Sequence, residues 1–204
     1  MIERIFYDRF EGKDSYIYIL KGDGIEIGIS DFGAAVQYIK LSLPSGERNV
    51  VIGYDTVSDR LDSGSYCGAT IGRVSNRIRN SEFVLNGKTY KITANEGKNC
   101  NHGGIGFDTR FFEATDELPL TMSLISDDGD SGFPGRLNLD VRFTLEGNAF
   151  EIKYTASSDK DTLWSPTCHA YFDLESTDSA LESYLKIYAH KILLLDGEHI
   201  PTGE

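Results

Sequence analysis

The chain has 204 residues, of which 40% are hydrophobic and 25% charged, and its formal net charge at pH 7 is −12. This strongly acidic balance argues against nucleic acid and against an anionic membrane as a partner, because both attract basic surfaces. A small neutral substrate is compatible with it. The length allows one large or two small domains, and because no linker or low-complexity tract interrupts the sequence we expect a single domain over residues 1–204.

The sequence shows no sign of export or membrane insertion. No amino-terminal run pairs a basic segment with an apolar stretch and a small-residue cleavage site, and no apolar run approaches the ~18 residues that span a bilayer. Cys67, Cys100 and Cys168 are an odd number at no repeating spacing, which fits reduced thiols better than a disulfide framework. We therefore expect a cytoplasmic protein.

Short runs that alternate apolar and polar residues dominate the amino-terminal part. Residues 15–20 and 24–30 form one such pair and predict a hairpin. Residues 34–43 predict the next strand, and residues 49–54 a further short one. Residues 56–62 indicate a single helical turn, with Thr56 or Ser58 as its cap.

The same alternation continues to the carboxyl-terminal part. Residues 82–92 alternate on either side of Asn86-Gly87, a dipeptide that strongly favours a tight hairpin turn. Further strands are predicted over residues 120–126, 137–145, 150–156, 162–174 and 184–195. No window of helical length keeps an apolar stripe, so the pattern indicates an antiparallel all-β sandwich or barrel.

Hydrogen-bonding side chains concentrate between Gly68 and Phe112, at backbone-constrained positions. This stretch holds the pair Asn76-Arg77 and the cluster Asn99 to Gly104. The predicted hairpin between them can place an arginine and a histidine at one rigid surface. The paired glycines after His102 let the backbone approach a ligand closely, which a Cβ would hinder.

The four histidines stand in different settings. His102 lies among asparagines and glycines, where a role in the core is improbable. Alternation around His169 places it on one strand face with Tyr171, and a satisfied interior histidine is as good a reading there as a functional one. His190 and His199 have polar neighbours without glycines or aromatics and are expected at the surface.

Arg73, Arg77 and Arg79 form a dense group of cations in this acidic chain. Each could be an ordinary surface arginine, but we expect at least one of them to face a cleft. The guanidinium is a rigid fork of donors that suits carboxylates or the hydroxyls of a polyol.

Neither a metal site nor a phosphate loop is expected. Cys100, His102, Cys168 and His169 are possible zinc ligands by type, but adjacent Cys168 and His169 would point to opposite faces of a strand. Their spacings match no zinc pattern. The glycines of residues 103–106 precede no helical pattern that could supply a positive terminus for phosphate.

Several blocks, in order across nearly the whole chain, match one known family. They are Ser30-Asp31-Phe32-Gly33-Ala34, Gly68-Ala69-Thr70-Ile71-Gly72-Arg73, Asn76-Arg77-Ile78, Leu85-Asn86-Gly87-Lys88, Asn99 to Gly104, Gly106-Phe107-Asp108, Gly132-Phe133-Pro134-Gly135, Pro166-Thr167 with His169, Tyr171 and Phe172, and Ile200-Pro201-Thr202-Gly203-Glu204. By these blocks the chain resembles the aldose 1-epimerase family, also called galactose mutarotase.

This resemblance implies a large antiparallel β-sandwich, the galactose mutarotase-like supersandwich, whose open face binds a hexose. It implies interconversion of the α and β anomers of free hexoses such as galactose or glucose, without a cofactor. Asn76 and Arg77 would contact sugar hydroxyls, and Tyr171 would line the site. His102 would hold and polarise the anomeric region, and His169 would donate the proton.

The resemblance also implies that an aspartate contacting the sugar and the catalytic base, a glutamate, lie beyond residue 204. Three alternatives follow: an active epimerase whose remaining segment comes from elsewhere, a sugar-binding relative without turnover, and a remnant that folds poorly. A sandwich that lacks its last strands has unpaired edges. We therefore expect self-association through exposed sheet edges.

Overall fold

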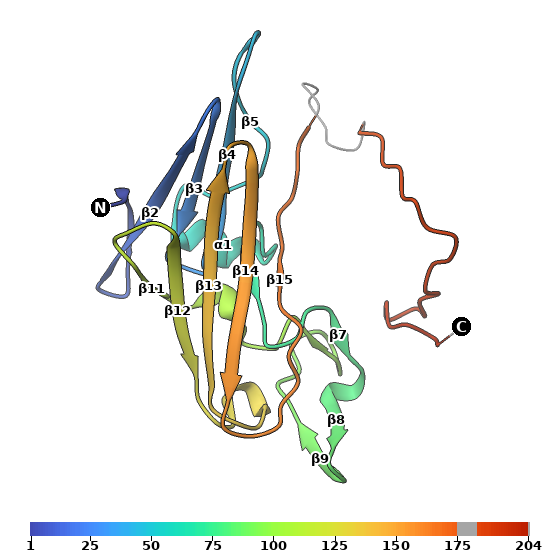
Figure 1. Ribbon diagram of the computed structural model, residues 1–204. Coiled ribbons are helices and arrows are strands. Elements are labelled where there is room, and N and C mark those ends of the chain that lie inside the picture. The colour runs from blue at the N-terminus through green and yellow to red at the C-terminus, as the bar shows by residue number, and fades with distance from the viewer. Residues whose placement is uncertain (175–182, 204) are drawn as a thin grey trace.

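The structure is a computed structural model that describes residues 1–174 and 183–203 (Figure 1). Two antiparallel sheets pack face to face. One has five strands in the order β1-β2-β3-β4-β5, and the other has four in the order β11-β12-β13-β14. The expected all-β antiparallel sandwich is thereby confirmed. No helix among the described residues is long and apolar enough to cross a membrane.

The five-stranded sheet is a meander, in which each strand pairs with the next along the chain. Its strands are β1 (Glu3–Phe10), β2 (Lys13–Gly22), β3 (Ile25–Ser30), β4 (Ala35–Leu43) and β5 (Gly46–Asn49). The predicted hairpin is β2 with β3, and β4 is the predicted strand after it. The prediction of a strand over residues 49–54 is wrong, because the chain pairs with β4 earlier, as β5.

The four-stranded sheet contains the long carboxyl-terminal hairpin of the sandwich. Its strands are β11 (Glu113–Ala114), β12 (Leu120–Ser126), β13 (Leu137–Glu146) and β14 (Ala149–Ser158). Strand β13 alternates buried and exposed residues along most of its length, because one of its faces covers the core. The strands predicted over residues 120–126, 137–145 and 150–156 are confirmed.

The main hydrophobic core lies between the two sheets. Ile27 and Ile29 of β3 are fully buried in it, as are Leu120 and Met122 of β12 and Val141 of β13. Complete burial of one such side chain stabilises the fold by about 1.5–3 kcal/mol relative to its exposure. These contacts hold the two sheets rigidly together, and the shorter elements pack against this sandwich.

Within the part of the chain that the structure describes, one α-helix, α1 (Val57–Ser63), follows β5. Its first turn is capped as predicted, because Thr56 Oγ1 accepts a hydrogen bond of 3.0 Å from the amide of Asp59. Arg60 is buried and ties the helix to the sheet, since its guanidinium donates to Gln37 Oε1 at 2.7 Å and to the carbonyl of Cys67 at 2.7 Å.

Three pairs of short strands lie outside the two main sheets. They are β6 (Thr70–Ile71) with β15 (Thr167–Cys168), β7 (Arg77–Ile78) with β10 (Cys100–Asn101), and β8 (Glu82–Leu85) with β9 (Lys88–Lys91). Two 3-10 turns adjoin these strands, η1 (Arg79–Ser81) between β7 and β8 and η2 (Phe107–Thr109) after β10. A third, η3 (Asp130–Gly132), connects β12 to β13.

The β8–β9 hairpin confirms the prediction from Asn86-Gly87. Both turn residues have positive φ, 53° and 75°, as a type I′ turn requires. The strands predicted over residues 162–174 and 184–195 are wrong for most of that length. Within the first range only β15 forms, and residues 184–195 contain no strand. Alternation alone is not enough, because a strand also needs a neighbour to complete its hydrogen bonds.

Candidate active site

Two imidazoles meet where the short strand pairs adjoin. His102 directly follows β10, and His169 directly follows β15. Their ring centroids lie 5.0 Å apart, and the ring planes are nearly perpendicular at 88°. Both side chains are half-buried. Segments 67 residues apart in the sequence therefore supply one pair of titratable groups.

The backbone on both sides fixes the position of His169. Its amide donates to the carbonyl of Ala69, and its carbonyl accepts from the amide of Gly68, both at 2.9 Å. Gly68 has φ of 72°, and a Cβ at this position would lie 2.0 Å from the carbonyl oxygen of Val36. Glycine is therefore required at this close approach of two chain segments.

A reciprocal contact with Asn76 fixes the tautomer of His102. The amide of His102 donates to the carbonyl of Asn76, and the amide of Asn76 donates to His102 Nδ1, both at 3.1 Å. Because a backbone N–H can only donate, Nδ1 must accept, and the proton of the neutral ring lies on Nε2. His102 thus offers an N–H donor on the side of the ring away from Asn76.

The electrostatic surroundings keep the His102 ring neutral. Burial lowers its pKa to about 4, and the nearby charges of His169 and Arg77 act in the same direction, while the carboxylate of Glu96 opposes them. At neutral pH His102 is therefore a hydrogen-bond donor and carries no charge.

Arg77 reaches the same place from β7. Its guanidinium has two partners: it donates to Glu96 through two nitrogens and to Asn76 Oδ1 through Nη1 at 3.1 Å. Hydrogen bonding to Arg77 lowers the pKa of Glu96. Asn76 and Arg77 thus form a polar rim beside His102, with donors that suit hydroxyl oxygens.

Two tyrosines enclose the imidazole pair. Tyr171, predicted to line the site, has its ring centroid 5.1 Å from that of His169. Tyr66 contacts both rings, with centroids 4.7 Å from His102 and 5.7 Å from His169. Sequence reasoning missed Tyr66, because it lies in a Gly- and Ser-rich loop with no periodicity. The one available signal is an aromatic residue just before the Cys67-Gly68 turn.

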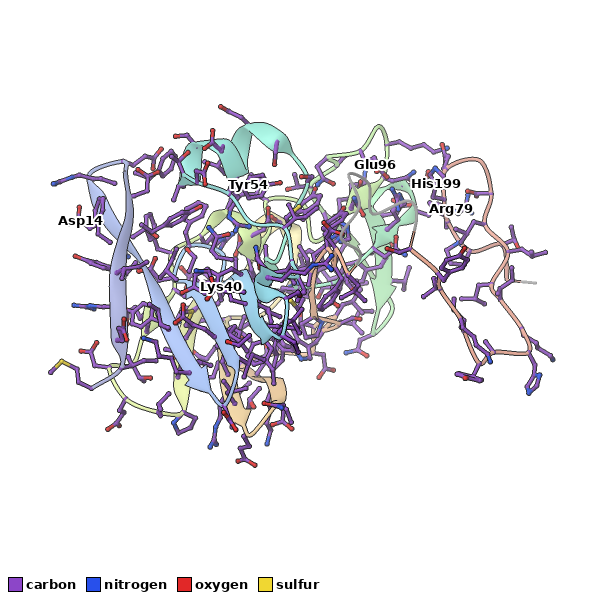
Figure 2. The ribbon with its side chains drawn as sticks, turned by 90° about the horizontal axis from the view of Figure 1, so that it is seen from above. Asp14, Lys40, Tyr54, Arg79, Glu96 and His199 are labelled. Carbon is purple, nitrogen blue, oxygen red and sulfur yellow. The ribbon has the colours of Figure 1, made fainter. Side chains whose placement is uncertain are left out.

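The other arginines singled out in the sequence lie elsewhere. Arg73 is buried in the interior and binds backbone carbonyls there. Arg79 pairs with Asp196 at 2.7 Å. Figure 2 shows Arg79 near Glu96 and His199, on the opposite side of the molecule from Asp14. Of the three arginines, only Arg77 joins the histidines.

The remaining candidates do not form a second centre. His190 and His199 are exposed, as expected. The thiols of Cys100 and Cys168 are set in apolar surroundings, and burial raises the pKa of each, that of Cys100 to about 11. Among the residues described, no group of three or more His, Cys, Asp or Glu side chains could hold a metal ion.

Known proteins resemble this chain over most of its length. The family model described as aldose 1-epimerase matches residues 16–204. The aldose 1-epimerase of Haemophilus influenzae is 36% identical over 210 residues, which cover 100% of this chain and 62% of the relative. The galactose mutarotase of Bos taurus is 33% identical over 190 residues, covering 91% of this chain and 56% of the relative.

A solved structure shows the same architecture. The crystal structure of a GalM/aldose epimerase homologue from C. elegans superposes with a TM-score of 0.87 at 30% identity, over 93% of this chain and 60% of that one. The chain thus spans roughly three fifths of the length of these relatives, with 62% and 56% of the two curated sequences matched. On sequence and fold together, it belongs to the aldose 1-epimerase family.

Proposed function

We propose that this chain supplies the sugar-binding rim and the acid of an aldose 1-epimerase, which interconverts the α and β anomers of a free hexose such as galactose or glucose. The observation that supports this most strongly is the His102–His169 pair, held 5.0 Å apart beside the donors of Asn76 and Arg77. A hexose needs several hydroxyl contacts and one group that can donate a proton to its ring oxygen, and this arrangement offers both.

The chemistry uses the two histidines differently. His169 donates a proton to the ring oxygen while a base removes the proton from the C1 hydroxyl, and the C1–O5 bond breaks to give the open-chain aldehyde. The C1–C2 bond rotates, and the ring closes on the other face with the proton transfers reversed. Neutral His102 donates through Nε2–H to the oxygen at the anomeric region and polarises it.

A second candidate is a sugar-binding protein without turnover. The proposed mechanism takes His169 as the acid, but it has no base among the site residues described, because His102 Nδ1 already accepts from the Asn76 amide and Arg77 can only donate. The hydroxyl contacts do not depend on proton transfer, so binding would persist without catalysis.

Polarimetry of freshly dissolved α-D-glucose or α-D-galactose separates the two functions. In an active enzyme, His169→Gln should lower kcat by roughly a hundred- to ten-thousandfold, the usual contribution of a positioned acid. The exposed His190→Gln is the matched control and should behave like the wild type. No acceleration over buffer, together with NMR shifts of the His102 and His169 signals on addition of sugar, would support the binding protein. Unmoved histidine signals would contradict both.

A further inference from the structure

Tyr66 is the one aromatic ring in contact with both imidazoles among the ring contacts described, at 4.7 Å from His102 and 5.7 Å from His169. It approaches His102 edge to face at 64° and lies tilted at 38° to His169. It therefore limits the rotation of both rings. Tyr171, by comparison, meets only His169 of the pair, at 5.1 Å.

The backbone at Tyr66 is held in an unfavourable conformation. Its φ is +33°, in the left-handed region that bulky residues rarely adopt. The carbonyl of Tyr66 accepts from the amide of Ala69 at 3.0 Å, so the turn before β6 keeps it there. Strain of this kind gathers at functional sites, where surrounding contacts maintain it.

A cavity of about 270 Å³ adjoins Tyr66. It lies between α1 and the turn that follows His102 and is lined by Arg60, Leu61, Gly64, Tyr66, Gly104, Ile105, Asp108 and Thr109. Burial raises the pKa of Asp108 to about 6, and its Oδ1 has no hydrogen-bond partner. Tyr66 is shared by this cavity and the imidazole pair, so its ring is part of the wall between them.

We propose that Tyr66 is a positioning residue, whose ring holds His102 and His169 in their mutual orientation and shields them from solvent and from the carboxyl group of Asp108 in the wall of the adjoining cavity. Its value for catalysis rests on the proposed epimerase function. The effect of Tyr66 on the two histidines is independent of that function and can be measured in the absence of any sugar.

The groups around His102 determine how loss of the Tyr66 ring should change the pKa of His102. His169 and Arg77 disfavour a proton on His102, Glu96 favours one, and burial is the largest influence on its lowered pKa. Burial is the main cause of the raised pKa of the Tyr66 hydroxyl, and the charges of Asp108 and Glu96 raise this pKa further. The tyrosine therefore stays neutral and acts through its ring. Removing the ring admits water and should return His102 toward its ordinary titration.

The test is an NMR titration of the histidine ring protons in the whole chain. In the wild type and in Tyr66→Phe the pKa of His102 should stay near 4, whereas in Tyr66→Ala it should rise by roughly one to two units. Tyr171→Ala is the control, because it removes a ring that meets His169 only. An unchanged His102 titration in Tyr66→Ala would overturn the proposal. So would an equal rise in Tyr66→Phe, because it would assign the effect to the hydroxyl.

Kinetics give a second, separate readout. Tyr66→Ala should lower kcat of mutarotation by roughly ten- to a hundredfold, the cost of misplaced catalytic groups, with little change in KM, and Tyr66→Phe should restore it. If Tyr66→Ala does not fold, Tyr66→Leu keeps apolar cover without the planar ring, so the His102 titration should stay near that of the wild type while kcat falls, and a wild-type kcat in that variant would contradict the proposal. If the wild type shows no mutarotation, the proposed enzymatic function fails, while the titration still decides the role of Tyr66.

Discussion

The guanidinium of Arg77 meets the carboxylate of Glu96 along two parallel hydrogen bonds, with Nε to Oε2 at 2.5 Å and Nη2 to Oε1 at 2.7 Å. This bidentate geometry fixes the plane of the guanidinium, so that Nη1 faces Asn76 and the rim beside His102. Glu96 thus orients Arg77, although it carries no assigned contact with sugar.

Glu96→Gln should therefore weaken sugar binding more than it slows chemistry. An amide can accept from only one nitrogen of the fork, so Arg77 becomes mobile and KM rises several-fold, while kcat changes less. Glu117→Gln, at an exposed turn before β12, is the matched control. Steady-state polarimetry over a range of sugar concentrations measures both constants. A fall in kcat at constant KM would show that Glu96 acts in the chemical step.

The stability of the chain should depend on pH through His102. Its pKa is about 4 in the folded state and near ~6.5 in an unfolded chain, so the unfolded state binds the proton first as pH falls. The contribution of His102 to stability is complete above about pH 6.5 and declines between there and about pH 4. Urea unfolding at closely spaced pH values measures this slope. His102→Asn should flatten the curve within that window, and an unchanged curve would contradict the lowered pKa.

Arg73 should be the most costly arginine to replace. Its side chain is 2% exposed and donates to the carbonyls of Pro134 at 2.8 Å and Ser126 at 2.9 Å. Arg73→Met leaves these two acceptors buried without partners, which should lower the free energy of unfolding by about 2–6 kcal/mol, since each unsatisfied group costs about 1–3 kcal/mol.

The matched control for Arg73 is Arg136→Met. Arg136 pairs with Asp127 at 3.4 Å in an exposed ion pair, so its loss should change stability by no more than about 0.5 kcal/mol. Arg73→Lys should recover little, because a single ammonium cannot reach both carbonyls as the fork does. Urea unfolding compares the three variants, and equal midpoints for Arg73→Met and Arg136→Met would contradict the structural role.

Self-association is the fourth expected outcome. Strands β1 and β14 stand at the ends of their sheets, and neither has an outer neighbour among the strands the structure describes. Residues 183–203 also expose large apolar side chains, including Leu185 at 85% and Tyr188 at 88%. Surfaces of this kind pair with other chains.

Sedimentation velocity over a concentration series measures the association. The wild type should shift to larger species as its concentration rises, and the double variant Leu185→Lys with Tyr188→Lys should shift less. Lys191→Gln, which changes an exposed polar residue in the same segment, should match the wild type. A wild type that sediments as a monomer at every concentration would show that these surfaces do not bind one another.

Much of the sandwich could be predicted from alternation, but β1 could not. The register of β1 against β2 shifts between Phe6 and Asp8, where a bulge puts the apolar residues out of phase. A period of two is then lost within the strand itself. The type I′ hairpin was predictable for the opposite reason, because Asn86-Gly87 determines its own turn without help from distant residues.

The sequence indicated which residues form the site, but it indicated less well which of them contact one another. Alternation around β15 placed His169 and Tyr171 on one face, and the structure has them side by side. The contact between His169 and His102 depends on the β6–β15 and β7–β10 pairings, which join distant segments and leave no periodic trace. Tyr66 was missed for this reason, since only the folded chain brings its loop against both rings.

The hydrogen bonds that hold His169 should affect the entropy of sugar binding measured by calorimetry. Its amide and carbonyl are both occupied by neighbouring backbone, and Gly68 beside it has no room for a side chain. The imidazole is therefore in place before any sugar arrives, and little conformational freedom remains for a ligand to remove. Binding of a hexose should accordingly proceed with a small entropic penalty from the protein, and the amide of His169 should exchange its hydrogen slowly whether or not sugar is bound.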